Sequence, residues 1–263
     1  MQPSTHKVGF TVYEVVPDDI KDPLTSNQLY QSQYNELVKF KLAQFNVVPD
    51  DIREPLLVNQ MRPSQYNEVQ RGWLRMNNGQ GLVLQGSDTD QEIFKEKLSY
   101  GLSHSVVFRK LFTDIANNPA QNVQVDIGRN QPNVLLDAFE YEASTETAKR
   151  NVQTIDLADL EQSPIFPPDA HPDAMTQIQN LIHTLEEARV GAKSSSTNPS
   201  ERYQQGHQAG IALENLYRLE QGQGGILQTE PVLMKGGYQW TYSNGHQEIW
   251  LVTGDQISGI IYP

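Results

Sequence analysis

Two neighbouring segments in the second half of the chain carry apolar residues at helical spacing. The recurrence over 173–190 and again over 200–221 predicts two amphipathic helices, each with one apolar stripe. A serine-rich loop separates the two segments. The stripe residues are Ala174, Ile178, Leu181, Leu185 and Ala188 in the first helix and Ala209, Ala212, Leu213, Leu216 and Leu219 in the second.

The middle of the chain is predicted to mix helix and strand. Apolar residues at helical intervals indicate a helix over 90–117. Two runs rich in apolar and β-branched residues, at 123–127 and 134–139, indicate strands. A proline-rich loop at 163–172 then leads into the first amphipathic helix.

Strand-like runs and tight turns alternate at the C-terminus. The runs lie at 238–242, 248–252 and 257–262, with Asn244-Gly245 in the first gap and Gly254-Asp255 in the second. An Asn-Gly pair between such runs is a strong hairpin signal. The fold class is therefore predicted as α+β, a mixed domain with two central helices and a C-terminal antiparallel β-meander.

The N-terminal part of the chain contains a tandem repeat. The sequence VVPDDIKDPL at 15–24 recurs 32 residues later as VVPDDIREPL, and SQYNE occurs at both Ser32 and Ser64. The prolines interrupt any helix, so each repeat is predicted as a short strand, a turn and a helix that starts at its serine. Two copies are too few for a solenoid. The repeats are either a docking or export-recognition segment or a duplicated structural hairpin.

The repeat ends before a sequence rich in glycine and asparagine at 77–81. Such a sequence is typical of a turn or linker. We therefore expect residues 1–78 to form a repeat-bearing extension and residues 79–263 to form one α+β domain with the candidate catalytic site.

Charge and composition exclude several classes of function. The net charge of −12 and the absence of a basic patch argue against binding to nucleic acid. The absence of cysteine excludes disulfides, thiolate zinc sites and cysteine nucleophiles. The sequence shows no signal peptide and no apolar run long enough for a membrane span. We expect a protein made in the cytoplasm, and this composition also suits export or injection by a specialised secretion machinery.

Ionisable side chains on the two amphipathic helices form a candidate metal site. His183 and Glu187 are four residues apart and project from one side of the first helix, while His207 and Glu214 lie on the polar side of the second. Imidazole and carboxylate at this spacing can offer two ligands to a zinc ion, with His207 as the third. In the alternative interpretation, all four side chains lie on ordinary solvent-exposed faces.

The expected roles divide between holding the ion and moving a proton. We expect His183, Glu187 and His207 to bind zinc, with Glu214 as a fourth ligand or as the partner that orients His207. A metal-bound water needs a nearby carboxylate to accept its proton. Glu186 is the expected catalytic base, and Glu214 is the other carboxylate considered for that role.

The sequence LIHTLEEA at 181–188 resembles the Leu-x-His-Glu-x-x-His-Ala helix of bacterial effector and toxin zinc metallopeptidases. From Phe108 onward, a helix, short strands and a proline-containing loop precede this segment in the same order. The resemblance places His183 at the first ligand position and Glu187 at the position of the second histidine. Thr184 stands where the family has its catalytic glutamate, so the resemblance implies either that Glu186 serves instead or that the site is inactive.

Three functional hypotheses follow. The first is a secreted or injected bacterial effector with a metal-dependent, peptidase-like hydrolase domain that acts on a protein substrate. The second is a non-catalytic binding or cargo protein whose repeats recognise a protein partner. The third is a glycosidase that uses two of the many carboxylates.

Overall fold

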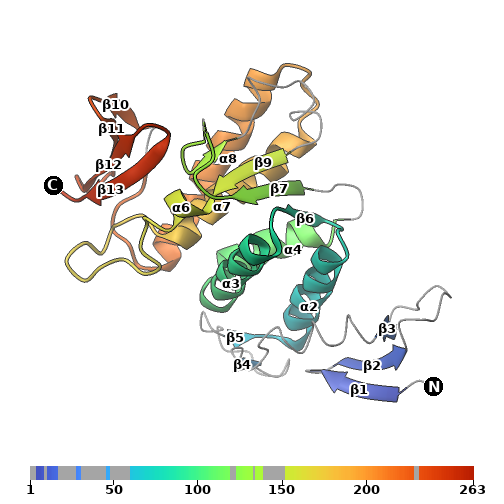
Figure 1. The fold of residues 1–263 in the computed structure, drawn as a ribbon. Helices are drawn as coiled ribbons and strands as arrows, with labels where there is room; N and C mark the ends of the chain where they lie inside the picture. Colours follow the sequence, from blue (N-terminus) through green and yellow to red (C-terminus); the bar gives the residue numbers. More distant parts are fainter. Residues whose placement is uncertain are drawn as a thin grey trace.

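The computed structural model describes residues 60–118, 123–132, 134–138, 152–227 and 231–263, together with four short N-terminal strands. The structure is mixed helix and strand, which confirms the α+β class (Figure 1). The helices are α2 (Pro63–Asn77), α3 (Asp88–His104), α4 (Val106–Ala116), α6 (Leu157–Leu160), α7 (Gln177–Lys193) and α8 (Pro199–Glu220).

Within the described part of the chain, the strands form four sheets in the order given by their hydrogen bonds. The N-terminal sheets are β1-β2-β3 and β4-β5, the central mixed sheet is β6-β7-β9-β8, and the C-terminal sheet is β10-β11-β12-β13. Their bounds are β1 (Ser4–Val8), β2 (Thr11–Val16), β3 (Gln28–Tyr30), β4 (Asn46–Val47), β5 (Gln60–Met61), β6 (Leu82–Gln85), β7 (Val123–Gly128), β8 (Asp137–Ala138), β9 (Val152–Asp156), β10 (Val232–Met234), β11 (Gly237–Thr241), β12 (Gln247–Thr253) and β13 (Gln256–Ile261).

The structure describes only part of the tandem repeat. Val15 and Val16 of the first copy lie in β2 and Val47 of the second lies in β4, while Val48, the Pro-Asp-Asp turns and the helix expected at Ser32 lie outside the described residues. The helix expected at Ser64 is confirmed as α2, which begins one residue earlier because Pro63 has the φ angle that suits a first helical position. The side chain of Gln65 accepts the N–H of Arg62 at 2.9 Å and closes the start of this helix.

Helix α2 packs into the same core as the elements that follow it. Tyr66 and Trp73 belong to one buried cluster with Phe94 of α3 and Phe112 of α4, and the Trp73 and Phe112 ring centroids lie 6.1 Å apart. The domain division after residue 78 stays a prediction. The shared core predicts that a cut before residue 60 disturbs the fold less than a cut within 77–81.

The single helix expected over 90–117 is divided into α3 and α4 at Ser105. Ser105 is extended, with φ −145° and ψ 128°, and its hydroxyl accepts the N–H of Phe108 at 2.9 Å. A carboxylate from α8 reinforces this break, because Glu220 accepts both the Ser105 hydroxyl and the N–H of Val106. The expectation of one continuous helix was wrong because a serine cap competes with helical hydrogen bonding.

The central sheet contains strands that the sequence pattern does not reveal. β6, β7 and β9 are parallel neighbours, and β8 joins β9 in the antiparallel sense. Of the run expected as a strand over 134–139, the described part, 134–138, forms only the two-residue β8, since the backbone at Leu136 has a φ of +62°. β9 is buried along its whole length, so it lacks the alternation that marks a half-exposed strand.

The two expected central helices are present as α7 and α8, and the C-terminal antiparallel sheet is present with one strand, β10, that was not expected. Helix α7 packs against α8 on one side and against β7 and β9 on another. Figure 1 shows the C-terminal sheet at the opposite side of the molecule from α2 and α3. The α7–α8 pair therefore lies between the central sheet and the C-terminal sheet, and it positions the site.

Candidate metal centre

Local capping fixes the beginning of both helices that carry the site. Thr176 accepts the N–H of Gln179 at 3.2 Å, and the Gln179 side chain accepts the N–H of Thr176 at 3.4 Å. The side chain of Asn198 accepts the N–H of Ser200 at 3.0 Å, and a proline follows Asn198 at the first helical position. The reciprocal pair at the start of α7 and the single cap at the start of α8 set the register of the side chains that each helix presents.

Two glycines on α8 allow it to approach α7 closely. A Cβ atom on Gly206 would lie 2.7 Å from the carbonyl oxygen of Glu187, and one on Gly210 would lie 3.0 Å from that of His183. Contacts this short exclude a side chain at Gly206 unless the helices move apart. The two glycines therefore bring the backbone of α8 against the turns of α7 that carry the candidate ligands.

His183, Glu187 and His207, which we call the ligand group, converge across this close contact. His183 Nε2 lies 3.1 Å from His207 Nδ1 and 3.3 Å from Glu187 Oε2, and His207 Nδ1 lies 3.3 Å from the same oxygen. Glu187 is almost fully buried, with 4% of its side chain exposed, while the imidazoles of His183 and His207 retain 17% and 15%. Each residue thus offers one potential ligand atom to a common point.

The three distances fit a tetrahedral ion. Zinc lies roughly 2.0–2.1 Å from nitrogen and oxygen ligands, so two ligands at a tetrahedral angle are separated by about 3.3–3.4 Å. The separations within the ligand group are 3.1, 3.3 and 3.3 Å. The group can therefore hold a metal ion with little rearrangement, and three protein ligands leave a fourth position for water or substrate.

Glu214 orients His183 rather than His207. Its Oε2 lies 3.2 Å from His183 Nδ1, and its Oε1 accepts the side-chain N–H of Gln179 at 2.8 Å. A carboxylate only accepts hydrogen bonds, so Nδ1 carries a proton, and Nε2 faces the ligand group. The ring of Tyr203 stacks on His207, with centroids 5.2 Å apart, and helps to orient that imidazole.

The carboxylates change the protonation of the ligand group. Burial lowers the pKa of His183, but hydrogen bonds to Glu187 and Glu214 outweigh it and raise that pKa to about 10. Burial raises the pKa of Glu187, yet His183 and His207 lower it overall. A proton on His183 therefore holds the metal-free group together, and a metal ion must displace it.

The structure does not bring Glu186 to the ligand group. Its carboxylate forms a two-pronged ion pair with Arg189, at 2.6 Å to Nε and 2.5 Å to Nη2. Glu214 is the carboxylate that lies beside the group. The interpretation of an ordinary exposed face was wrong for Glu187 and Glu214, which are 3% and 2% exposed, because the C-terminal sheet and α8 cover what the isolated helices leave open.

A cavity of about 150 Å³ adjoins the ligand group. Both imidazoles of the group line it, so an ion held there can be reached from the cavity. Most of the remaining lining is apolar or aromatic. The other lining residues are Leu135, Leu136, Met175, Asn180, Thr184, Ile211, Glu214, Leu227, Pro231, Tyr238, Trp240 and Trp250.

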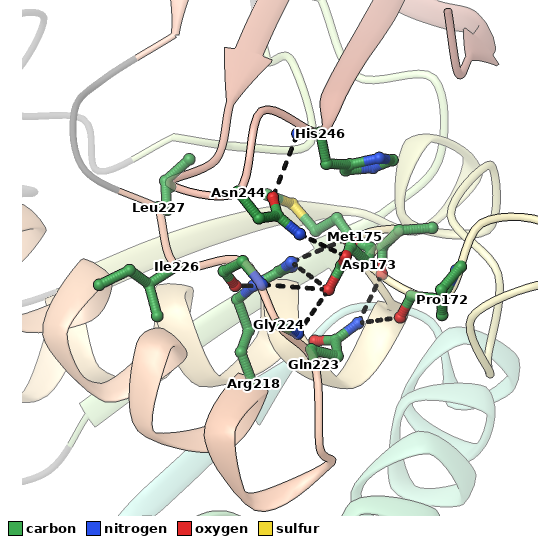
Figure 2. Close-up of polar contacts among 12 residues, drawn as sticks. Pro172, Asp173, Met175, Arg218, Gln223, Gly224, Ile226, Leu227, Asn244 and His246 are labelled. Carbon is green, nitrogen blue, oxygen red and sulfur yellow. Dashed lines mark hydrogen bonds and ion pairs between the residues drawn. The ribbon is translucent and has the colours of Figure 1, made fainter.

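A polar network that includes the ion pair between Arg218 and Asp173 links α8, the loop before α7 and the C-terminal sheet (Figure 2). Arg218 donates to the carbonyls of Gly225 at 2.6 Å and Asp173 at 2.9 Å, and its guanidinium lies 4.0 Å from the ring centroid of Tyr242. The Asp173 carboxylate accepts the N–H of Gly224 at 2.8 Å and the side chain of Asn244 at 2.6 Å. We call these residues the Arg218 network. It holds the hairpin turn of the sheet against the loop that leads into α7.

Glu248 makes a second link between the sheet and α7. It is fully buried and accepts the N–H of Met175 at 2.9 Å and the indole N–H of Trp250 at 2.6 Å. Burial raises the pKa of Glu248 to about 7. Because Met175 and Trp250 both line the cavity, Glu248 holds these two parts of its lining in place.

Sequence reasoning missed the residues that complete the site from outside the two helices. Trp240 and Trp250 line the cavity from the C-terminal sheet. Trp240 alternates with Gln239 and Thr241, whereas Trp250 lies between Ile249 and Leu251 and has no such signal. Gln179 carries a recognisable signal, because Thr176 and Gln179 have the spacing of a capping box. Nothing in the local sequence indicates that the same Gln179 reaches Glu214 on another helix.

Comparisons with protein-family models, curated proteins and solved structures find no match to this chain. The resemblance to zinc metallopeptidases therefore stays a prediction. Within the described residues, no helix combines the length and apolarity needed to cross a membrane.

Proposed function

We propose that this chain is a zinc-dependent hydrolase whose metal site is the ligand group. The observation that supports it best is the convergence of His183 Nε2, His207 Nδ1 and Glu187 Oε2 at the edge lengths of a tetrahedral site. Two nitrogens and one carboxylate oxygen are a ligand set that catalytic zinc sites use. Zinc in such a site polarises a carbonyl group and lowers the pKa of its bound water.

The residues around the ligand group supply orientation. Gln179 holds Glu214, Glu214 holds Nδ1 of His183, and the second nitrogen of that ring is left for the ion. As a carboxylate beside the group, Glu214 replaces Glu186 as the better-placed proton acceptor. The proposed substrate is a protein or peptide, and the proposed biological setting is a bacterial effector that is exported or injected.

A second candidate function is a metal-dependent binding protein without catalysis. The observation that favours it is that the oxygens of Glu186 are held by Arg189 and those of Glu214 by Gln179 and His183. A carboxylate whose two oxygens already accept hydrogen bonds is a weaker proton acceptor than a free one. In this alternative, the N-terminal repeats recognise a protein partner.

Elemental analysis of the purified chain after dialysis against zinc separates a metal site from an ordinary polar cluster. We expect one zinc ion per chain in the wild type, none in His183→Ala or His207→Ala, and one in the control His104→Ala, because His104 lies outside the ligand group. Absence of stoichiometric zinc from the wild type would refute the proposal.

Hydrolysis of unfolded casein by the zinc-loaded chain then separates the two functions. Under the hydrolase proposal, Glu214→Gln retains zinc and loses turnover, whereas Glu186→Gln retains both. Zinc binding without turnover in the wild type would favour the binding protein.

A further inference from the structure

The cavity beside the ligand group has two chemically different walls. One wall comes from α7 and α8 and carries the polar side chains, with the imidazoles of His183 and His207 among them. A second wall comes from the C-terminal sheet and carries Tyr238, Trp240 and Trp250. A substrate group that enters the cavity therefore meets the ion on one side and aromatic rings on the other.

The aromatic wall is fixed before any substrate arrives. The ring centroids of Trp240 and Trp250 lie 4.3 Å apart, and the indole N–H of Trp250 is held by Glu248 at 2.6 Å. Trp250 is 2% exposed and Glu248 is fully buried. A preorganised apolar wall of this kind favours binding, because little conformational freedom remains to be lost.

The volume of the cavity matches a single substrate side chain. It measures about 150 Å³. An apolar protein cavity of about 150 Å³ stays dry and binds benzene. The side chain of phenylalanine or leucine therefore fits, whereas a longer chain or a fused ring system exceeds the space.

The charges around the cavity favour an uncharged group. No lysine or arginine occurs among the described residues that line it, and Glu214 is the acidic one. Both oxygens of Glu214 already accept hydrogen bonds, from Gln179 and from His183. A basic substrate group would have to compete with Gln179 and His183 for this carboxylate, and an acidic group would be repelled by it.

A strained backbone shapes the remaining edge of the cavity. Leu136 lines the cavity with a φ of +62°, a conformation that costs about 1–3 kcal/mol in a residue with a Cβ. The carboxylate of Asp159 accepts the N–H of Leu136 at 3.0 Å, and the carbonyl oxygen of Leu136 accepts the N–H of Asp156 at 2.9 Å. Buried acidic residues thus hold a bulky apolar side chain where glycine would be the unstrained choice.

We infer that this cavity is a specificity pocket for one uncharged apolar side chain of the substrate, about the size of a benzene ring. The pocket would lie next to the substrate bond that is hydrolysed at the metal site. The inference rests on the proposed metal-dependent hydrolase. It assigns Trp240, Ile211 and Leu136 as residues that determine specificity.

Binding of two small hydroxamates to the zinc-loaded full-length chain tests the inference without requiring a known substrate. Acetohydroxamate offers only a metal-binding group, and phenylacetohydroxamate adds a benzyl group. Calorimetry should show that the benzyl compound binds at least about tenfold more tightly, because its ring leaves water for the cavity. The hydroxamate of succinic acid, which carries a carboxylate in place of the ring, should show no such gain.

A pair of matched variants on α8 locates the preference. Ile211→Phe fills the cavity and should abolish the preference for the benzyl compound while zinc is retained. Leu216→Phe adds the same ring at a position that is 54% exposed and should leave the preference unchanged. Leu136→Gly, which relieves the backbone strain and removes one side of the pocket, should reduce the preference without loss of zinc.

The possible failures of the two proposals are distinguishable. Equal binding of the two hydroxamates by a zinc-loaded chain, or a preference that survives Ile211→Phe, would overturn the pocket and leave the metal site intact. Failure to retain zinc would overturn the proposed function. Binding of benzyl alcohol to the metal-free chain, measured by tryptophan fluorescence, then tests the cavity alone. Quenching in the wild type that is lost in Ile211→Phe supports the pocket, and no quenching in the wild type overturns it.

Discussion

Helix α8 contributes to two buried polar clusters that differ in how their atoms are paired. In the Arg218 network, a guanidinium donates to carbonyl oxygens and a carboxylate accepts amide protons. In the ligand group, two ring nitrogens and one carboxylate oxygen lie within 3.3 Å of one another. The first cluster pairs opposite charges and the second gathers atoms that carry lone pairs.

This difference indicates what each cluster is for. Donors matched to acceptors stabilise a fold without any further component. Three lone-pair atoms directed at one point require a positive charge between them, either a proton or a metal ion. The Arg218 network is therefore structural, and the ligand group is built for a cation.

The largest effect should come from the Arg218 network. Arg218→Ala removes a fully buried guanidinium and leaves Asp173 without its charged partner, so we expect the free energy of unfolding to fall by about 3–5 kcal/mol with or without zinc. Urea unfolding followed by circular dichroism measures this loss. Lys110→Ala, which breaks the exposed pair with Asp114, is the control and should change stability by less than about 0.5 kcal/mol.

If Arg218→Ala does not fold, Arg218→Lys retains the charge while losing the planar donors, and it should lose part of the same stability. A change below about 1 kcal/mol in either variant would contradict a structural role for the network.

Glu248 should make the stability depend on pH. Burial raises the pKa of Glu248 to about 7 in the folded protein from an ordinary value of 4.5, so the folded state binds this proton more tightly. The resulting stabilisation is complete below pH 4.5 and is lost as pH rises to 7, with a magnitude on the order of 3 kcal/mol. Urea unfolding at a series of pH values should show this decline in the wild type and a flatter profile in Glu248→Gln. The same dependence of stability on pH in the wild type and in Glu248→Gln would contradict this role of Glu248.

Zinc should stabilise only a chain with an intact ligand group. At a free zinc concentration 100 times the dissociation constant, binding adds about 2.7 kcal/mol to the free energy of unfolding. We expect a thermal shift with zinc in the wild type and in His104→Ala, and none in His207→Ala. Equal shifts in all three chains would show that zinc binds elsewhere.

The smallest effect tests the close contact of the helices. Gly206→Ala introduces a Cβ atom 2.7 Å from the carbonyl of Glu187, so the helices must separate, at a cost of about 1–3 kcal/mol. The ligand atoms would separate with them, and zinc affinity should fall at least tenfold in a competition titration with a chelator. Gln208→Ala, an exposed position on the same helix, is the control. Unchanged affinity in Gly206→Ala would contradict the role of the glycine.

Local patterns in the sequence predict a substantial part of the fold. The apolar stripes predict α7 and α8, and the Asn-Gly turn predicts the hairpin between β11 and β12. The first helix begins at Gln177 rather than near residue 173, because Asp173 instead accepts the N–H groups of Gly224 and Gly225. A tertiary contact of this kind has no local signal.

The candidate site is only partly predictable for the same reason. The spacing of His183 and Glu187 identifies one side of α7, whereas the convergence with His207 depends on the approach of α8 through its glycines. The pairing of Glu186 with Arg189 could be predicted from their i, i+3 spacing. The aromatic wall could not be predicted, because it depends on how the C-terminal sheet packs on the helices.

X-ray absorption spectroscopy of the zinc-loaded chain tests the central claim most directly. The geometry predicts a four-coordinate zinc with two imidazole nitrogens and oxygen ligands at about 2.0–2.1 Å, and the loss of one imidazole in His207→Ala. A six-coordinate shell of oxygen atoms alone, or an imidazole signal unchanged in His207→Ala, would show that the ligand group is not the metal site.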